Sequence, residues 1–222
     1  MQTADWYFDF ISPYAYFGLV RLAELSNDLE IRYRPVLFAA LLEHWGQKGP
    51  AEIPTKRAWT YRSCTWWATR HGIPFRFPAA HPFNPLPYLR LAVAAGNTAQ
   101  AVQLIFRALW TTGADPSDVQ VLTALARSLD VDQSRLSEQD VKDALRLETE
   151  QALARGVFGV PTLIVDEQLF WGADATDFAR AYLADPGIVA TDEMKRVTML
   201  PMGASRKLGD FGGNLRFKPC PR

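Results

Sequence analysis

A change of pattern within residues Asp9–Gly18, DFISPYAYFG, decides how this chain folds. The chain is apolar and aromatic up to this point, and Ala4–Phe10 therefore predicts a buried strand. Ser12 is a favoured helix cap, and Pro13 suits the first helical position because the N–H that proline lacks has no partner there. Apolar residues then recur at helical spacing, so a strand passes directly into a helix.

Further strands are predicted on either side of a long central region. Residues Glu30–Val36 predict a second strand, which makes the first two strands a parallel pair joined by a crossover helix. Two short strands joined by a tight turn are predicted at Thr162–Val165 and Gln168–Trp171, with a helix at Ala175–Leu183. Pro161 stands where a strand can begin with proline, and the bond before it is a candidate for the cis form.

The central region predicts helices only. Between about Phe38 and Ala154 we find no convincing strand, and Lys56–His71 predicts one helix. Three more amphipathic helices follow, with candidate N-caps at Asn97, Ser117 and Ser137. The order of elements is that of an α/β protein whose strands are interrupted by a helical insertion.

Composition limits the possible partners. Lysine and arginine together number 24, as do aspartate and glutamate, so the 222-residue chain has a formal net charge of zero. Proteins that bind nucleic acid usually carry a clear basic excess, so we expect no nucleic-acid partner. No apolar stretch reaches the ~20 residues of a membrane span, and no secretory signal is recognisable, so we expect no membrane partner. Two distant cysteines do not support a disulfide framework, which favours a cytoplasmic protein. The segment 199–222, rich in glycine, proline and basic residues, is expected to be flexible.

Cysteines and histidines are few and scattered. Cys64 and Cys220 lie far apart, and neither they nor the three histidines show the spacing of a disulfide framework or a metal site. Cys64 is predicted to be a packed helix residue, although a reactive role stays open.

Ser12 lies at a place that can bind an anion. The carboxyl end of a strand and the first turn of a helix meet there, and the exposed backbone N–H groups and the helix dipole favour negative charge. A simple capping role for Ser12 is the alternative. A serine nucleophile is disfavoured because no G-x-S-x-G elbow is present and no histidine can be assigned as its base.

Three segments together resemble a known family. FDFISPYAYFG, FRFPAAHPFNPLPYLRLA and GVFGVPTLIVDEQLFWGAD are similar to segments of the kappa-class glutathione transferases and, more closely, of the bacterial 2-hydroxychromene-2-carboxylate isomerases. The similarity covers roughly residues 4 to 185. It implies a thioredoxin-like β-α-β…α-β-β-α core made of residues 1–37 and 150–190, with an inserted all-helical domain at 38–149.

The resemblance implies a glutathione site in which Ser12 addresses the sulfur. Thiol–disulfide enzymes of this fold carry C-x-x-C where this chain reads Ser12-Pro13-Tyr14-Ala15, so thiol exchange by protein cysteines is excluded there. By the same resemblance Val160 would pair its backbone with the cysteinyl unit of glutathione, ahead of a cis Pro161.

The resemblance also assigns the two ends of glutathione. Ala173 and Asp174 would hold the γ-glutamyl end, with a plain helix cap as the alternative for Asp174. Gln47 replaces a family asparagine in the segment WGQKGP, and Lys48, which could instead be merely solvated, would meet a carboxylate.

Residues for the second substrate are less clearly marked. Arg62 and Asn84 are candidates for substrate binding together with Lys48, and Asn84 could instead be a structural cap. The family often has phenylalanine at the position of His81.

The expected activity is that of a glutathione-dependent isomerase. It would interconvert 2-hydroxychromene-2-carboxylate and trans-o-hydroxybenzylidenepyruvate, a small aromatic 2-oxo acid, by reversible thiolate addition. One alternative is a kappa-class transferase that acts on electrophiles, and another is a redox-inactive thioredoxin-like module that binds peptides beside Pro161. Family members are commonly homodimers, which we expect here too.

Overall fold

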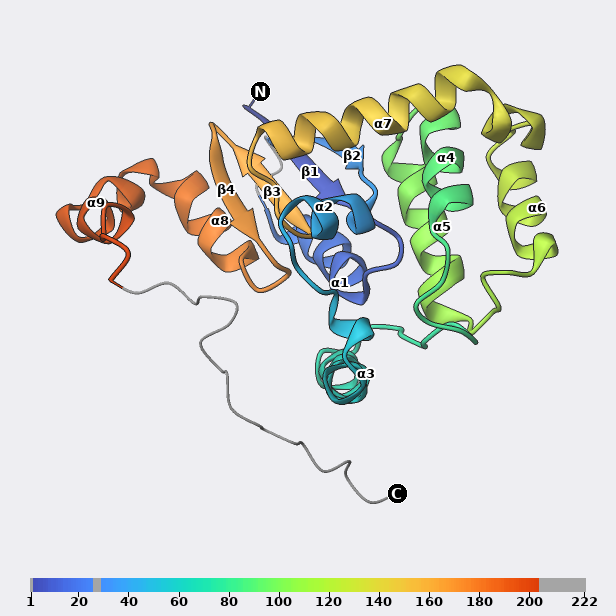
Figure 1. Ribbon diagram of the computed structural model, residues 1–222, viewed down its shortest axis with the longest axis horizontal. Coiled ribbons are helices and arrows are strands. Elements are labelled where there is room, and N and C mark those ends of the chain that lie inside the picture. Colours follow the sequence, from blue (N-terminus) through green and yellow to red (C-terminus); the bar gives the residue numbers. More distant parts are fainter. Residues whose placement is uncertain (1, 26–28, 204–222) are drawn as a thin grey trace, which may run out of the picture. The chain divides into compact units, whose positions relative to one another are not determined.

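A four-stranded mixed sheet in the order β2-β1-β3-β4 forms the centre of the fold (Figure 1). Strand β1 lies parallel to β2, with Trp6 opposite Tyr33, and antiparallel to β3, with Trp6 opposite Leu163. The strands are β1 (Gln2–Phe8), β2 (Leu29–Pro35), β3 (Thr162–Val165) and β4 (Gln168–Trp171). The predicted parallel pair and the predicted α/β class are therefore confirmed.

The computed structural model describes residues 2–25 and 29–203. The chain divides into two units, Met1–Ala184 and Asp185–Arg222. Most of the tail that we expected to be flexible, together with Cys220, lies outside the described residues. The predicted boundaries between the thioredoxin-like part and the helical insertion stay a prediction.

The turn from β1 into α1 (Pro13–Arg21) forms as the sequence predicts. Ser12 is the N-cap, and its Oγ accepts the N–H of Ala15 at 3.2 Å. Strand β1 ends at Phe8, two residues before the predicted end, because Asp9 begins the turn instead of continuing the strand. The Val160–Pro161 bond is cis, as expected.

One face of the sheet packs against helices through aromatic rings. Trp6 and Phe8 stack with their centroids 4.9 Å apart, and both lie close to Phe106 of α5. Phe170 of β4 meets Tyr182 of α8 on the same side, at 5.5 Å. Burying large aromatic side chains supplies much of the stabilisation of such a core.

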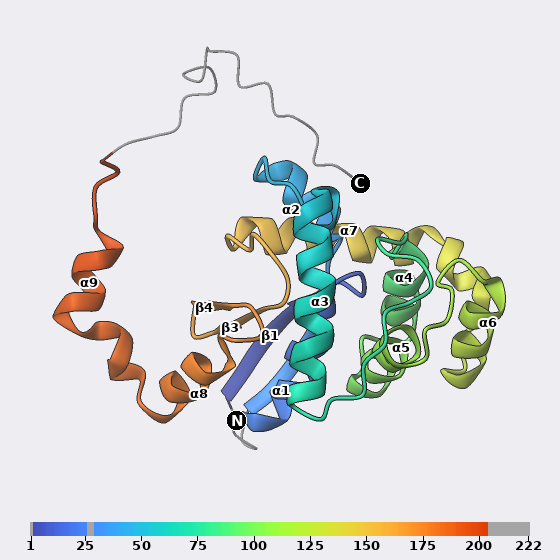
Figure 2. The same cartoon turned by 90° about the horizontal axis from the view of Figure 1, so that it is seen from below.

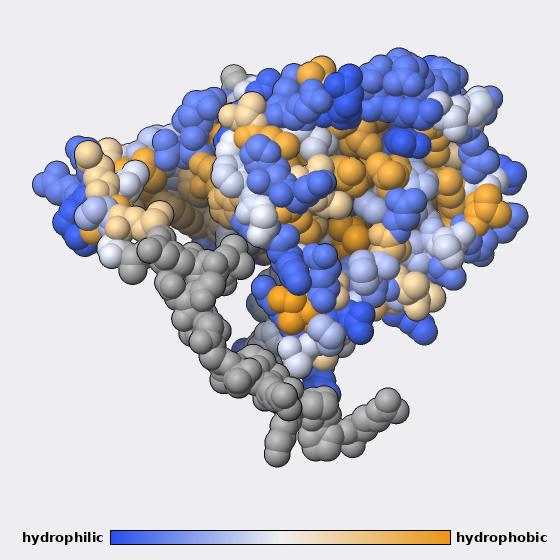
Figure 3. Space-filling view, viewed as in Figure 1, coloured by the Kyte–Doolittle hydropathy of each residue, from blue (hydrophilic) through white to orange (hydrophobic). Residues whose placement is uncertain are grey.

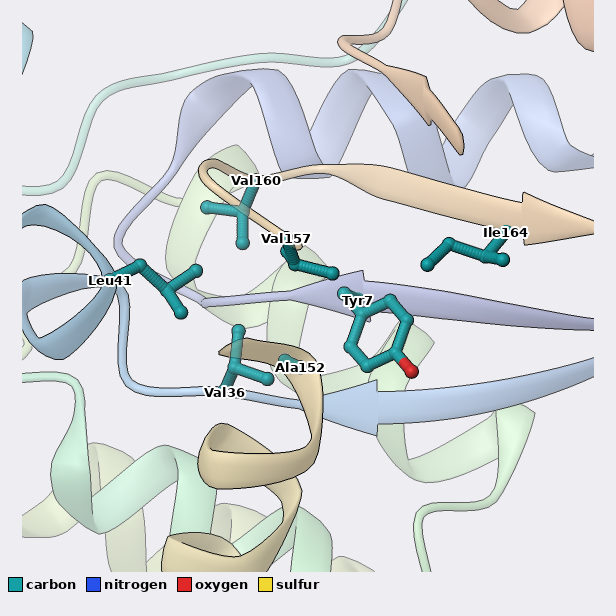
Figure 4. Close-up of a cluster of buried hydrophobic side chains, with 7 residues drawn as sticks. All are labelled: Tyr7, Val36, Leu41, Ala152, Val157, Val160 and Ile164. Atoms are coloured by element: carbon teal, nitrogen blue, oxygen red, sulfur yellow. The ribbon is translucent and has the colours of Figure 1, made fainter. Parts of the chain in front are cut away.

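The other face carries a second buried cluster, shown in Figure 4. Leu41 of α2 and Ala152 of α7 pack against side chains of the sheet and of the chain before β3. The cluster consists of Tyr7, Val36, Leu41, Ala152, Val157, Val160 and Ile164. Because Val160 points its side chain into this core, only its backbone is left for the adjoining site.

A buried ion-pair network anchors β1 on the same side. Asp5 binds Arg34 at 2.9 Å and Arg155 at 2.6 Å, and Arg155 also donates to the hydroxyl of Tyr7. Burial raises the pKa of the Asp5 carboxyl, but Arg34 and Arg155 outweigh it, so the pKa is lowered overall. Removing one partner of such a pair is costly because it leaves the other charge buried.

Residues 38–154 are all described, and none of them forms a strand. The helices are α2 (Phe38–His44), α3 (Pro54–Arg70), α4 (Leu86–Ala94), α5 (Ala99–Thr111), α6 (Val119–Ser128) and α7 (Gln139–Ala154). Figure 3 shows apolar side chains in the middle of one face of the molecule, below the hydrophilic outer surface of α7.

Three predicted caps were wrong by one residue. Thr98 and Asp118 cap α5 and α6 in place of Asn97 and Ser117, and Glu138 precedes α7 in place of Ser137. Neighbouring residues that can all cap compete, and backbone geometry that the sequence does not reveal decides between them. Asn97, for example, adopts a left-handed conformation with φ 52° and so cannot occupy the extended cap position.

The last helix of the first unit is α8 (Thr176–Ala184), one residue later than predicted. Within the second unit, α9 (Asp192–Thr198) was not predicted, although Thr191 caps it and acidic residues precede basic ones along it. Among the described residues, no helix is long and apolar enough to cross a membrane.

Candidate functional site

Ser12 and Val160 meet at the carboxyl edge of the sheet. The Ser12 hydroxyl is buried and lies 3.5 Å from the carbonyl of Val160, which it can reach only as a weak donor. Gly18 makes this approach possible, because a Cβ at that position would lie 2.9 Å from Cγ of Pro161. The structure thus brings together two of the predicted site residues that lie 148 positions apart.

The turn that carries Ser12 is held by a backbone hydrogen bond of its own and by two side chains from distant parts of the chain. The carbonyl of Asp9 accepts the N–H of Ser12 at 3.1 Å. The carbonyl of Phe10 accepts the indole N–H of Trp110 in α5 at 2.9 Å. The carbonyl of Ile11 accepts a hydrogen bond from His81 Nε2 at 2.8 Å. Three consecutive carbonyls are therefore fixed, which leaves Ser12 little freedom to move.

Asp9 is the buried acid of this turn. Its Oδ1 accepts the N–H of Ile11 at 3.0 Å, and its Oδ2 accepts the N–H of Phe38, the first residue of α2, at 2.9 Å. Burial raises the pKa of Asp9 to about 7, against the lowering effect of these two hydrogen bonds. We did not predict this residue, although a single acid inside the apolar run WYFDFI could have indicated it.

His81 was noticed in the sequence only as a departure from the family pattern. Its Nδ1 lies 2.7 Å from the hydroxyl of Tyr61 on α3, while its Nε2 contacts Ile11. Burial lowers the pKa of His81, so the ring is neutral at neutral pH and carries its proton on Nε2, facing the carbonyl. The pair Tyr61–His81 therefore links α3 to the peptide that precedes Ser12.

Helix α3 lies along α1 (Figure 2). Phe17 of α1 and Trp67 of α3 have ring centroids 4.7 Å apart. Burial raises the pKa of the Tyr14 hydroxyl, which neighbours Thr60 and Cys64. Cys64 is buried, as predicted for a packed helix residue, and burial raises the pKa of its thiol to about 12. A thiol with such a pKa is not a nucleophile at neutral pH.

Ala173 and Asp174 precede the first turn of α8. Ala173 is buried, and its carbonyl accepts hydrogen bonds from Arg21 Nη1 and from the hydroxyl of Thr176, both at 2.9 Å. Asp174 is exposed, and its side chain has no hydrogen-bond or ionic partner among residues 2–25 and 29–203. Arg21, which fixes the start of α8, was not predicted from the sequence.

Gln47 and Lys48 lie in the exposed loop after α2. The indole N–H of Trp45 donates to the carbonyl of Val157 at 3.0 Å, which ties this loop to the segment before Pro161. Neither the Gln47 side chain nor the Lys48 side chain contacts a partner in the described part of the chain.

The two remaining candidates behave differently. Asn84 accepts the N–H of Leu86, the first residue of α4, at 3.1 Å, although Pro85 holds the N-cap position, and a ligand contact of Asn84 stays a prediction. Arg62 is exposed on α3, and the structure does not bring it into contact with the other predicted site residues.

Comparison with known proteins identifies the family of this chain. A family model described as a DSBA-like thioredoxin domain matches residues 3–184. A 2-hydroxychromene-2-carboxylate isomerase from Sphingobium xenophagum is 33% identical over 193 residues, which cover 83% of this chain and 99% of that protein. Glutathione S-transferase kappa 2 from Caenorhabditis elegans is 26% identical over 209 residues, covering 83% of this chain and 93% of that protein.

A solved structure is also similar. It is that of a 2-hydroxychromene-2-carboxylate isomerase, with a TM-score of 0.73 and 27% identity, covering 86% of this chain and all of that one. The chain therefore belongs to the DsbA-like thioredoxin family, in the group formed by 2-hydroxychromene-2-carboxylate isomerases and kappa-class glutathione transferases.

Proposed function

We propose that this protein is a glutathione-dependent isomerase that interconverts 2-hydroxychromene-2-carboxylate and trans-o-hydroxybenzylidenepyruvate. The similarity to proteins with that name is the main support. The observation that carries the mechanism is the position of Ser12, whose hydroxyl lies 3.5 Å from the carbonyl that precedes the cis proline. The positions that carry sulfur in thiol–disulfide enzymes hold Ser12 and Ala15, so sulfur chemistry at this site needs a thiol from elsewhere.

The residues present fit glutathione. The N–H of Val160 has no acceptor among the described residues and lies beside Ser12, where a peptide-like ligand could pair with it. Asp174 could accept the α-amino group of the γ-glutamyl unit, near the first N–H groups of α8. Lys48 and Gln47 lie in the exposed loop after α2, which Trp45 ties to the segment before Pro161, and a carboxylate or an amide of the tripeptide could bind there.

Bound glutathione would supply a thiolate that adds reversibly to a conjugated carbon–carbon double bond and so allows that bond to rotate. Ser12 would donate a hydrogen bond to the sulfur, since its hydroxyl is held only loosely by Val160 in the present geometry. The amino end of α1 adds a favourable dipole at the same point.

The required stabilisation is modest. A free thiol with a pKa of about 8.5 is only a few per cent ionised at neutral pH. Lowering its pKa by about two units needs roughly 2.7 kcal/mol in favour of the thiolate. One charge-assisted hydrogen bond, worth about 1.5–3 kcal/mol, and the helix dipole together reach this value.

The direct test is to mix the purified protein with 2-hydroxychromene-2-carboxylate, with and without glutathione, and to follow the absorbance of the open form. We expect turnover only with glutathione, and mass spectrometry should recover all of the glutathione unmodified. Equal rates with and without glutathione would contradict the proposed mechanism.

A kappa-class transferase is the second candidate, because relatives of that name are 26% and 22% identical to this chain. The same mass spectra separate the two activities, since a transferase leaves a glutathione thioether. A protein that binds no glutathione in a calorimeter would instead favour the peptide-binding module.

A further inference from the structure

Helix α3 and the loops that flank it carry an unbalanced positive charge. Between His44 and His81 only one acidic residue occurs, Glu52, and its carboxylate already accepts the N–H of Gly49. Six cationic residues lie in the same stretch, Lys48, Lys56, Arg57, Arg62, Arg70 and Arg76. Within the described part of the chain, the four on α3 form no ion pair and no side-chain hydrogen bond.

The packed face of α3 shows which of these cations faces the site. Thr60, Cys64 and Ala68 are the buried residues of α3 and define the centre of that face. At about 100° per residue, Arg57 lies roughly 20° from this centre and Arg62 roughly 160° from it. Arg57 therefore lies on the packed face of α3, about one turn before Thr60, whereas Arg62 lies on the opposite face.

The next residues on the Arg57 side lead directly to Ser12. Tyr61 follows Arg57 by one helical turn, and such pairs are neighbours on a helix surface. The Tyr61 hydroxyl lies 2.7 Å from His81 Nδ1, and His81 Nε2 lies 2.8 Å from the carbonyl of Ile11, which shares its peptide group with the nitrogen of Ser12.

The positive charge of Arg57 acts on two residues of this chain of contacts. Burial lowers the pKa of His81, and the positive charge of Arg57 lowers it further. The same charge opposes the rise that burial causes in the pKa of Tyr61. Arg57 is exposed and forms no ion pair with any of the described residues, so it is available to an anionic group of a ligand.

We propose that Arg57 binds the carboxylate of the aromatic 2-oxo acid substrate, on the α3 side of the site and across from Ser12. This inference rests on the proposed function, because it names the residue that recognises the acid. A guanidinium can hold a carboxylate through two parallel hydrogen bonds, which a lysine cannot do. Arg57 thereby replaces Arg62 as the α3 residue that we assign to the substrate.

Two probes isolate the contribution of the carboxylate. Benzylidenepyruvate carries the conjugated ketone and the acid, whereas benzylideneacetone carries the same conjugated ketone without the acid. Their dissociation constants are measured by calorimetry on the full chain, with S-methylglutathione in place of glutathione so that no thiol can add. We expect the unaltered protein to bind the acid more tightly, and Arg57→Gln to weaken that binding about tenfold while leaving the ketone within twofold.

Matched variants separate a local contact from the general charge of α3. Arg57→Lys keeps the charge and should recover part of the affinity for the acid. Arg70→Gln removes the same charge about 20 Å further along the helix and should change the affinity for either probe less than twofold. Arg62→Gln should behave like Arg70→Gln.

The outcomes distinguish this inference from the proposed function. A loss confined to the acid probe in Arg57→Gln supports the inference even where no isomerase turnover is detected. Equal binding of the two probes by the unaltered protein overturns it, as does a selective loss in Arg62→Gln but not in Arg57→Gln, whatever the turnover with 2-hydroxychromene-2-carboxylate.

Discussion

The two sides of the site differ in how their polar groups are satisfied. In the turn from Asp9 to Ser12, three successive carbonyls accept hydrogen bonds and the Asp9 carboxylate accepts two N–H groups. On α3 the side chains of Arg57 and Arg62 extend into solvent, and neither has an acidic partner among the described residues. The polar groups of the turn find their partners within the protein, whereas the cations of α3 are left to pair with a ligand.

This difference separates positioning from recognition. A hydroxyl that must meet a sulfur atom benefits from a turn that is already rigid, since little entropy remains to be lost on binding. A cation that must find a carboxylate can stay solvated and mobile, at the cost of a weaker and salt-sensitive interaction. Substitutions in the turn should therefore change turnover or stability, and those on the cationic side should change mainly affinity.

The largest effect is expected for Ser12→Ala. Loss of the hydroxyl that stabilises the thiolate should lower turnover about 10²–10³-fold at saturating glutathione, as for removal of one oxyanion-hole donor. The lost N-cap should cost only about 1 kcal/mol, so the circular dichroism spectrum should be unchanged. Ser12→Thr is the matched control, because it keeps a hydroxyl. Unchanged turnover in Ser12→Ala would place the chemistry elsewhere in the site.

Asp9→Asn tests the buried acid of the rigid side. Burial raises the pKa of Asp9 to about 7, whereas the unfolded chain ionises it near 3.8. Between pH 3.8 and about pH 7 the folded state therefore keeps a proton on Asp9 that the unfolded state has lost. For this reason the contribution of Asp9 to the unfolding free energy falls as the pH rises through this range. Above about pH 7 both states are ionised, and the contribution no longer changes. An amide has one acceptor for two N–H groups and does not titrate.

Asp9→Asn should therefore be less stable than the unaltered protein at pH 4. The difference in unfolding free energy should shift in favour of Asp9→Asn by about 4 kcal/mol between pH 4 and pH 8, since the pKa of Asp9 is raised by about three units. Urea unfolding at the two pH values measures it. A gap that stays constant with pH would show that Asp9 has an ordinary pKa in the folded state.

His81→Phe tests whether the link from α3 to Ile11 matters. The ring packs where the histidine did, but the carbonyl of Ile11 loses its donor, which should cost about 1–1.5 kcal/mol of unfolding free energy and lower turnover several-fold. Tyr61→Phe removes only the hydroxyl that contacts Nδ1 and should have a smaller effect. Should both variants match the unaltered protein, the turn would be rigid without His81.

The smallest effect is expected on the cationic side. Lys48→Gln should raise the KM for glutathione about two- to fivefold with little change in kcat, because an exposed ion pair contributes up to about 1 kcal/mol. The increase should shrink in 0.5 M salt, where exposed charges are screened. Lys195→Gln, the same charge change on α9, is the control. A salt-independent loss of kcat would instead place Lys48 among the rigid groups.

Local patterns were enough for most elements of the fold. The bounds of β3 and β4, the helix start at Pro13 and the cis form before Pro161 all match the prediction, because neighbouring residues encode them. Caps were missed where adjacent residues competed, as with Asn97 and Thr98. The short helix α9 was missed because its polar sequence lacks a stripe that marks a buried face.

A site residue could be predicted only where its residue type and its place along the chain were enough to mark it. Ser12 and Pro161 could be named from the sequence. Asp9 was missed, although an acid inside an apolar run marks it. The roles of His81 and Trp110 could not be predicted, because each acts through a partner from a distant part of the chain. Arg62 was the only residue of α3 that we named for substrate binding from the sequence, and the packed face of α3 shows that it lies opposite the buried residues of that helix.

The sequence by itself determined the order of strands and helices, the serine at a helix start and the lack of sulfur at that start, since these depend on residues a few positions apart. Tertiary structure alone decided that this serine meets the proline loop, that a buried acid and a histidine hold its turn, and that Arg57 rather than Arg62 lies on the packed face of α3. Such pairings depend on how helices pack over the sheet, and packing joins residues whose separation along the chain carries no information about their distance in space.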